Sequence, residues 1–216
     1  MEGLFYNYGE FEQHLADLRS PDRETCRKAA RTLGEMGPKA APAVPALLGL
    51  LKDKTNPGGF IAGDAHAAIV SIGVPLAADI PAVAGVLKDG DPRVRQDALH
   101  LLGNLAYKHT SDDALERMVP EVIGMLASAD YATQSAAINF LRWLGPHAAP
   151  ASAALAALLT HTEPSLRWQA AEALGLIGPA AKHVIPALAA AMADPDPKVR
   201  AHTAAALKSL KGKETK

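Results

Sequence analysis

The stretch "DPRVRQDALHLLGNLA", residues 91–106, decides the fold because close copies of it recur along the chain. Two further copies are "EPSLRWQAAEALGLIG" at 163–178 and "DPKVRAHTAAALKSLK" at 196–211. Aligning weaker copies on the arginine of this motif gives six units, spaced by 36, 33, 39, 33 and 33 residues. Their residues at the arginine position are Cys26, Ala62, Arg95, Gln134, Arg167 and Arg200. Regular recurrence at this period predicts a repeat protein.

Each copy has the apolar spacing of a helix. In the copy at 163–178, Leu166, Ala170, Leu174 and Ile177 recur at the i, i+4, i+8 and i+11 positions and form one apolar stripe. An acidic residue followed by proline is a helix start signal. The Gly-Pro dipeptides at 37–38, 145–146 and 178–179 are stop signals.

A second helical motif alternates with the first, for example "APAVPALLGLLKD" from Ala41 and "AKHVIPALAAAMAD" from Ala181. Short helices in antiparallel pairs follow from this alternation. No segment shows sustained alternation of apolar and polar residues, so we expect no sheet. One helix pair cannot bury its apolar stripe alone, whereas stacked pairs can. The prediction is an all-α fold of about six stacked helical hairpins.

Composition sets limits on the class of protein. The chain has 216 residues, is 49% hydrophobic and carries a net charge of −1, which is typical of a globular protein and does not favour a nucleic-acid or membrane partner. A single cysteine, Cys26, excludes an internal disulfide and a cysteine-based zinc site. No secretory signal and no uninterrupted apolar run of about eighteen residues is apparent. We therefore expect a cytoplasmic protein.

The repeated motifs resemble HEAT repeats, in particular the short bacterial variety also found in phycobilisome lyases. The resemblance rests on the D-P-x-V-R opening, the A-A-x-A-L-G-x-I-G body and the preceding P-A-L-x-x-L-x-D helix, and it covers roughly residues 22–210. It implies a right-handed α-solenoid in one domain, 1–216. It also implies that the D-P-x-V-R helices line the concave side.

The terminal segments and two long connections depart from the repeat. Residues 1–20 are predicted to form an atypical N-terminal cap, with a helix over 9–19, and residues 211–216 form a basic tail. Four aromatic residues, Phe5, Tyr6, Tyr8 and Phe11, would cover the open end of the stack. The connections "KTNPGGF" at 54–60 and "AYKHTSDD" at 106–113 are longer than the others and are candidate functional loops.

The acids and arginines of the motif are predicted to be architectural. An acid and an arginine one turn apart stabilise a helix start and tie it to the next repeat. The pairs are Asp91 with Arg95, Glu163 with Arg167 and Asp196 with Arg200.

Function is expected where the motif varies on its solvent side. Counting from the arginine position, residues at +2, +5 and +9 point away from the buried stripe, and Trp168 at +1 lies beside them. Trp143 and Trp168 are the only tryptophans, and exposed indoles often anchor a protein partner. The predicted partner-binding residues are Asp64, Asp97, His100, Asn104, Asn139, Trp143, Trp168, Gln169 and Glu172.

Part of this set could also serve chemistry. Asp97, His100 and Asn104 share a helix face, and with Asp64 on the adjacent helix they could bind a metal or transfer a proton. Metal-dependent hydroxylases built on HEAT repeats carry His-Glu dipeptides, and none of the eight histidines here precedes a glutamate. We therefore assign no catalytic residue, metal or other cofactor from the sequence.

The favoured function is a non-catalytic scaffold or adaptor that binds a protein partner in the concave groove, acting as a monomer. No phosphate-binding loop, nucleophile elbow or metal signature argues for an enzyme. Two alternatives stay open through the resemblance, a bilin lyase that handles a tetrapyrrole and a HEAT-like DNA glycosylase. The glycosylase would need a basic groove, where Arg27, Lys28 and Arg31 are opposed by acids.

Overall fold

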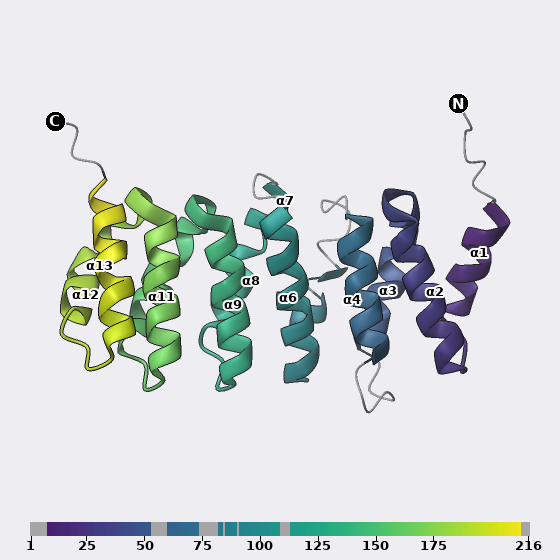
Figure 1. Cartoon of the computed structure of the whole chain (residues 1–216), viewed down its shortest axis with the longest axis horizontal. Coiled ribbons are helices and arrows are strands. Elements are labelled where there is room, and N and C mark those ends of the chain that lie inside the picture. The colour runs from purple at the N-terminus through teal and green to yellow at the C-terminus, as the bar shows by residue number, and fades with distance from the viewer. Residues whose placement is uncertain are drawn as a thin grey trace. The chain divides into compact units, whose positions relative to one another are not determined.

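The computed structural model describes residues 8–52, 60–73, 82–83, 85–89, 91–108 and 113–212. Most of the two long connections, the N-terminal Phe5 and Tyr6, and tail residues 213–216 lie outside the described residues. Every regular element in the described ranges is helical, which confirms the all-α prediction (Figure 1). Contacts group the chain into two compact units, residues 1–101 and 102–216.

The first unit is built on helix pairs. Helix α2 packs against α1 and α4, and α3 packs against α4. Phe11 of α1 is buried, in agreement with a role in covering the end of the stack. The elements are α1 (Tyr8–Asp17), α2 (Arg23–Glu35), η1 (Gly37–Ala43), α3 (Val44–Leu51), α4 (Phe60–Ile72) and α6 (Pro92–Lys108) as far as Leu101.

The second unit repeats the pattern in two layers. Helices α9, α11 and α13 lie side by side (Figure 1), and α8, α10 and α12 each pack against the corresponding member of that layer. The elements after α6 are α7 (Asp113–Glu116), α8 (Val119–Met125), α9 (Tyr131–Leu144), η2 (Gly145–Ala151), α10 (Ser152–Ala157), η3 (Leu158–Thr160), α11 (Pro164–Ile177), η4 (Gly178–Val184), α12 (Ile185–Ala191) and α13 (Pro197–Lys211).

Aspartates at the start of the repeated motif cap three of the helices, whereas Glu163 at the start of α11 makes no side-chain cap hydrogen bond. Asp22 accepts a hydrogen bond from the backbone nitrogen of Thr25 at 2.9 Å, and Asp196 accepts one from Lys198 at 2.7 Å. Asp130 caps α9 in the same way. These bonds satisfy backbone donors that the first turn of a helix leaves unpaired. The start signal read in the sequence therefore acts through capping.

The Gly-Pro dipeptides end the helices as predicted. Gly37, Gly145 and Gly178 have φ values of 60°, 55° and 70°, a region that residues with a Cβ rarely adopt. The proline that follows each glycine begins a 3₁₀ helix, because proline at the first positions of a helix needs no backbone hydrogen bond. The chain thus reverses direction in a fixed way at each of these points.

The arginines of the motif donate hydrogen bonds to backbone carbonyls of the loop that precedes their own helix. Arg167 Nη1 donates to the carbonyl of His161 at 2.8 Å, and Arg200 Nη1 donates to the carbonyl of Asp194 at 2.8 Å. The Nε atom of Arg167 also binds the Asp194 carboxylate at 2.7 Å. The position is architectural, as predicted, because it ties the helix to the loop before it and to the following repeat.

Two of the three copies without arginine keep this contact with other donors. Gln134 Nε2 donates to the carbonyl of Leu126 at 2.9 Å, and the thiol of Cys26 donates to the carbonyl of Leu18 at 3.3 Å. Both acceptors lie at the end of the preceding helical segment, where carbonyls lack helical partners. Cys26 is therefore a buried structural residue.

Small residues let neighbouring helices approach closely. A Cβ added to Gly34 of α2 would lie 2.9 Å from the Cα of Ala68 in α4, and one added to Gly175 of α11 would lie 3.1 Å from the Cα of Ala206 in α13. Glycine stands eight residues after the arginine position in both helices. The body of the repeated motif thus sets the distance between helices, while the stripe from Leu166 to Ile177 is buried as predicted.

Residues 164–191 have the length and hydropathy of a membrane span, but they are not one straight helix. Helix α11 ends at Gly178, whose positive φ turns the chain into η4 and α12. Helix α11 has 14 residues, fewer than the roughly 20 needed to cross a bilayer. It packs between α9 and α13, so its apolar character is explained by the core.

Candidate functional site

The most exposed aromatic cluster of the second unit surrounds Trp143. This side chain is 38% exposed and Tyr107 is 63% exposed, and the two rings meet edge to face with centroids 4.6 Å apart. The guanidinium of Arg142 lies 4.9 Å from the centre of the Trp143 ring. These contacts hold the indole in place while leaving much of it open to solvent, which is the property of a binding anchor.

Helix α11 continues this surface. Glu172 accepts a hydrogen bond from Arg142 Nη1 at 2.9 Å, so its charge is balanced by α9. One turn further on, Leu176 is 50% exposed. Both residues stand at the predicted solvent-facing positions of the motif.

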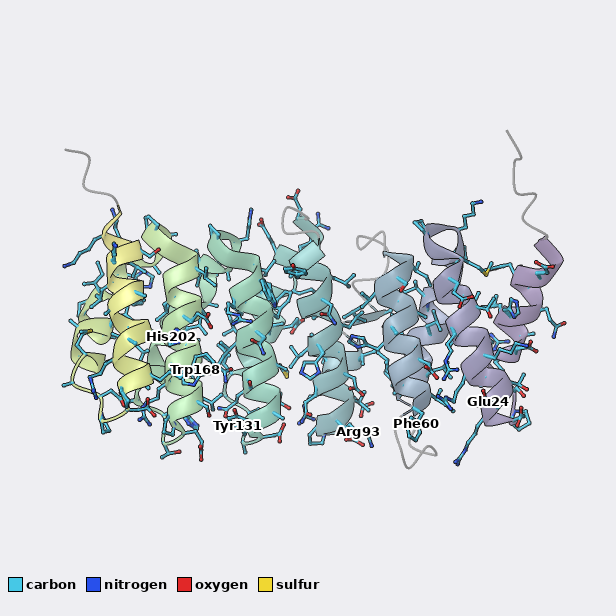
Figure 2. The ribbon with its side chains drawn as sticks, in the orientation of Figure 1. Glu24, Phe60, Arg93, Tyr131, Trp168 and His202 are labelled. Carbon is cyan, nitrogen blue, oxygen red and sulfur yellow. The ribbon has the colours of Figure 1, made fainter. Side chains whose placement is uncertain are left out.

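Trp168 forms a second aromatic cluster. The ammonium of Lys198 lies 3.5 Å from the centre of the Trp168 ring, and the ring of His202 stacks at 5.0 Å with a tilt of 33°. Trp168 is half-buried, and Figure 2 shows it on α11 beside His202 of α13. The indole is therefore part of the outer surface of the helix layer and not of the core.

A groove lies between these helices. It encloses about 310 Å³ and is lined by Glu172, Gly175, Leu176, His202, Ala205, Ala206 and Ser209. Its floor is shallow and apolar because Gly175 and Ala206 carry little or no side chain where α11 and α13 meet. Ser209 Oγ closes one end by donating to the carbonyl of Gly175 at 2.6 Å.

A larger groove, of about 440 Å³, lies at the other edge of the unit, between α10, α12 and the loop before α13. Its lining is mostly alanine and leucine. The charged side chains in it, Arg167 and Asp194, are bonded to each other. This groove contains none of the predicted site residues.

One predicted site residue is buried, and its assignment to the solvent side is wrong. Gln169 is buried where α11 packs against α9, and its Oε1 accepts a hydrogen bond from Ser135 Oγ of α9 at 2.8 Å. The +2 position turns toward the preceding helix in this repeat, and Ala136 is buried at the same position of α9. The +5 and +9 positions of α9 and α11 are half-buried or exposed. Those residues are Asn139, Trp143, Glu172 and Leu176.

In the first unit, the predicted site residue Asp64 is paired with two arginines of α2. Its carboxylate accepts hydrogen bonds from Arg27 Nε at 2.8 Å and from Arg31 Nε at 3.0 Å. Burial acts to raise the pKa of Asp64, but the hydrogen bonds and charges of the two arginines outweigh it and lower the pKa. Asp64 therefore acts as the link between α2 and α4.

His66, two residues after Asp64, was not predicted from the sequence as a candidate residue. His66 of α4 is half-buried, and burial lowers its pKa while the charge of Asp97 opposes the shift. Burial also raises the pKa of Asp97. His100 is exposed nearby and adds to the lowering at His66. Among the residues that the structure describes, no group of three or more His, Cys, Asp or Glu side chains could hold a metal ion.

The structure also adds residues to the second-unit surface. Tyr107 and Lys198 stand outside the +2, +5 and +9 positions and were not predicted to contribute. Asn104, which was predicted, is exposed on α6. Tyr107 could have been predicted from the sequence, since it is a large aromatic residue at the end of an otherwise regular helix. Lys198 could only be found from its contact with Trp168 in the neighbouring helix.

Comparisons with known proteins agree with this fold. Residues 151–216 match the family model of HEAT repeats. No curated protein sequence matches the chain. Among solved structures, an engineered protein is 24% identical, with a TM-score of 0.63 over 94% of this chain and 96% of its own.

Two designed armadillo repeat proteins are also similar. One is 19% identical, with a TM-score of 0.62 over 93% of this chain and 99% of its own. The other, solved in complex with the peptide (KR)4, is 18% identical, with a TM-score of 0.66 over the same shares. The chain is thus an α-solenoid repeat protein of the armadillo/HEAT type. Residues 151–216 carry the match to HEAT repeats, which confirms there the resemblance that the repeated motifs indicated.

Proposed function

We propose that this protein is a non-catalytic interaction scaffold that binds a protein segment on the surface of α9, α11 and α13. We call this surface the strip. It consists of Asn139, Arg142, Trp143, Trp168, Glu172, Leu176, Lys198, His202 and Lys208, with Tyr107 at its edge. The fold supports the proposal, because repeat solenoids are typical protein-interaction scaffolds.

The observation that carries the proposal is the exposure of Trp143 and Leu176 beside the groove. Exposed indole and leucine side chains on one surface mark a protein interface more often than an isolated apolar residue does. Covering the open part of Trp143 would remove on the order of 90 Å² from water and contribute roughly 2 kcal/mol.

The test is capture of native partners by the immobilised chain, followed by mass spectrometry. We expect Trp143→Ala and Leu176→Ser to reduce the captured partner at least tenfold with a change in melting temperature of only a few degrees. Met192→Ala is the matched control, because Met192 is 40% exposed but lies after α12, outside the strip. Capture by both the Trp143 and the Leu176 variant that equals capture by the unmodified chain would refute the proposal.

The two enzyme alternatives have weaker support. A DNA glycosylase groove would use the basic residues Arg27, Lys28 and Arg31. Arg27 and Arg31 both bind Asp64, and Lys28 is the exposed one of the three that does not. Binding of duplex DNA that weakens steeply with salt would revive that alternative. A shift in visible absorbance on mixing with a linear tetrapyrrole would do the same for a bilin lyase. A cytoplasmic location and a monomeric state are part of the proposal, and size-exclusion chromatography with light scattering tests the second.

A further inference from the structure

We infer that the strip binds an extended acidic peptide with apolar side chains. This inference rests on the proposed function and adds the chemistry of the partner. It follows from the charges that line the groove between α11 and α13 and from the spacing of the two lysines beside it.

The charges of the strip leave a positive surplus. Arg142 and Glu172 balance each other through their hydrogen bond at 2.9 Å. Lys198 and Lys208 of α13 are both exposed, and within the described part of the chain neither forms an ion pair. The strip therefore presents two uncompensated ammonium groups and attracts carboxylates.

One of these ammonium groups is fixed in position. Lys198 lies over the Trp168 ring at 3.5 Å, and the ring of His202, one turn further along α13, lies 5.0 Å from the same indole. The aromatic surface orders the lysine side chain, so a carboxylate that binds it meets a preformed charge. An apolar side chain next to that carboxylate can rest on the indole.

The groove supplies the apolar part of the site. Gly175, Leu176, Ala205 and Ala206 form most of its lining, and its volume of about 310 Å³ accommodates a leucine or phenylalanine side chain. His202 and Glu172 bound it on the polar side. Lys208 stands three residues after Ala205 on α13 and is exposed, outside the lining of the groove.

The distance between Lys198 and Lys208 along α13 determines how far apart the acidic residues of the peptide must be. Ten helical residues separate Lys198 from Lys208, a rise of about 15 Å. An extended chain advances about 3.3 Å per residue, so acidic residues four to five positions apart reach both lysines. Apolar residues between them then lie over the groove. A basic peptide, such as the (KR)4 ligand of the designed armadillo neighbour, would meet like charges here.

The experiment uses three acetylated and amidated eight-residue peptides, (EELL)2, (KKLL)2 and (EEGG)2. Both tryptophans of the chain lie on the strip, so intrinsic fluorescence reports binding, and calorimetry gives the affinity independently. We expect (EELL)2 to bind at least tenfold more tightly than the other two and to weaken as salt increases. Lys198→Gln and Lys208→Gln should each weaken it severalfold. Lys182→Gln, an exposed lysine on η4, is the matched control and should not.

The outcomes separate this inference from the proposed function. Equal or tighter binding of (KKLL)2 overturns the acidic preference, and equal binding of (EEGG)2 overturns the role of the groove. Failure of all three peptides, with native capture still dependent on Trp143, overturns the inference and leaves the scaffold function standing. Capture that is indifferent to both Trp143→Ala and Leu176→Ser overturns the scaffold function itself.

Discussion

The close contact between α2 and α4 predicts an unusual response to a glycine substitution. Alanine is normally preferred over glycine inside a helix, by roughly 0.5–1 kcal/mol. Gly34 lies in the last turn of α2, one residue before its end at Glu35, so propensity alone predicts that Gly34→Ala stabilises the protein. The new Cβ, however, would lie 2.9 Å from the Cα of Ala68 and 3.2 Å from its Cβ.

The atom in the way belongs to the backbone of α4, so the clash cannot be relieved by a side-chain rotation. An ordinary contact requires 3.4 Å or more, and the two helices must therefore separate by about half an ångström, which forfeits a quarter or more of the attraction at each contact there. Overpacking of this kind costs about 1–3 kcal/mol. After subtraction of the gain in propensity, Gly34→Ala should lower the free energy of unfolding by roughly 0.5–2 kcal/mol.

Urea unfolding followed by circular dichroism measures this change, with Gly63→Ala as the matched control. Gly63 is also inside a helix, α4 of the same unit, and a Cβ added there meets no atom within 4 Å. The control should gain roughly 0.5–1 kcal/mol, so the two variants move in opposite directions. If Gly34→Ala is as stabilising as Gly63→Ala, the close approach of α2 and α4 is wrong.

Two further predictions concern ionisable groups. Asp194→Ala leaves Arg167 without its carboxylate and should cost about 1–3 kcal/mol in urea unfolding, with part of the loss recovered when Arg167→Met is added. The hydrogen bond from Arg167 lowers the pKa of Asp194, so this contribution is present above its unfolded pKa near 3.8 and is lost as the pH falls through the lower folded value. His66 has a pKa lowered by burial, with Asp97 opposing and His100 assisting. The free energy of unfolding should therefore fall as the pH drops below about 6.5, because the unfolded chain gains the proton first. His66→Gln should flatten this pH dependence. If the variant has the same pH profile as the unmodified chain, the imidazole is not buried as described.

Features that depend on residues close together in the sequence were predicted correctly, whereas features that depend on contacts between helices were not. The stripe from Leu166 to Ile177, the cap at Asp196 and the stops at the Gly-Pro dipeptides were predicted correctly, since each depends on residues within about one or two helical turns. Gln169 was placed wrongly because Ser135, which binds it, belongs to another helix. His66 was missed for a similar reason, since its burial depends on packing between helices.

The sequence by itself determined that the chain is a series of paired helices with a repeated apolar stripe, because helical period, capping and helix termination are local properties that each motif carries. Only the tertiary structure decided which polar residues are bonded within the protein and which remain available to a partner. Arg27 and Arg31 are taken by Asp64, Arg142 is taken by Glu172, and Lys198 is held over Trp168. These pairings join residues of different helices, and their distances are set by how closely the backbones pack.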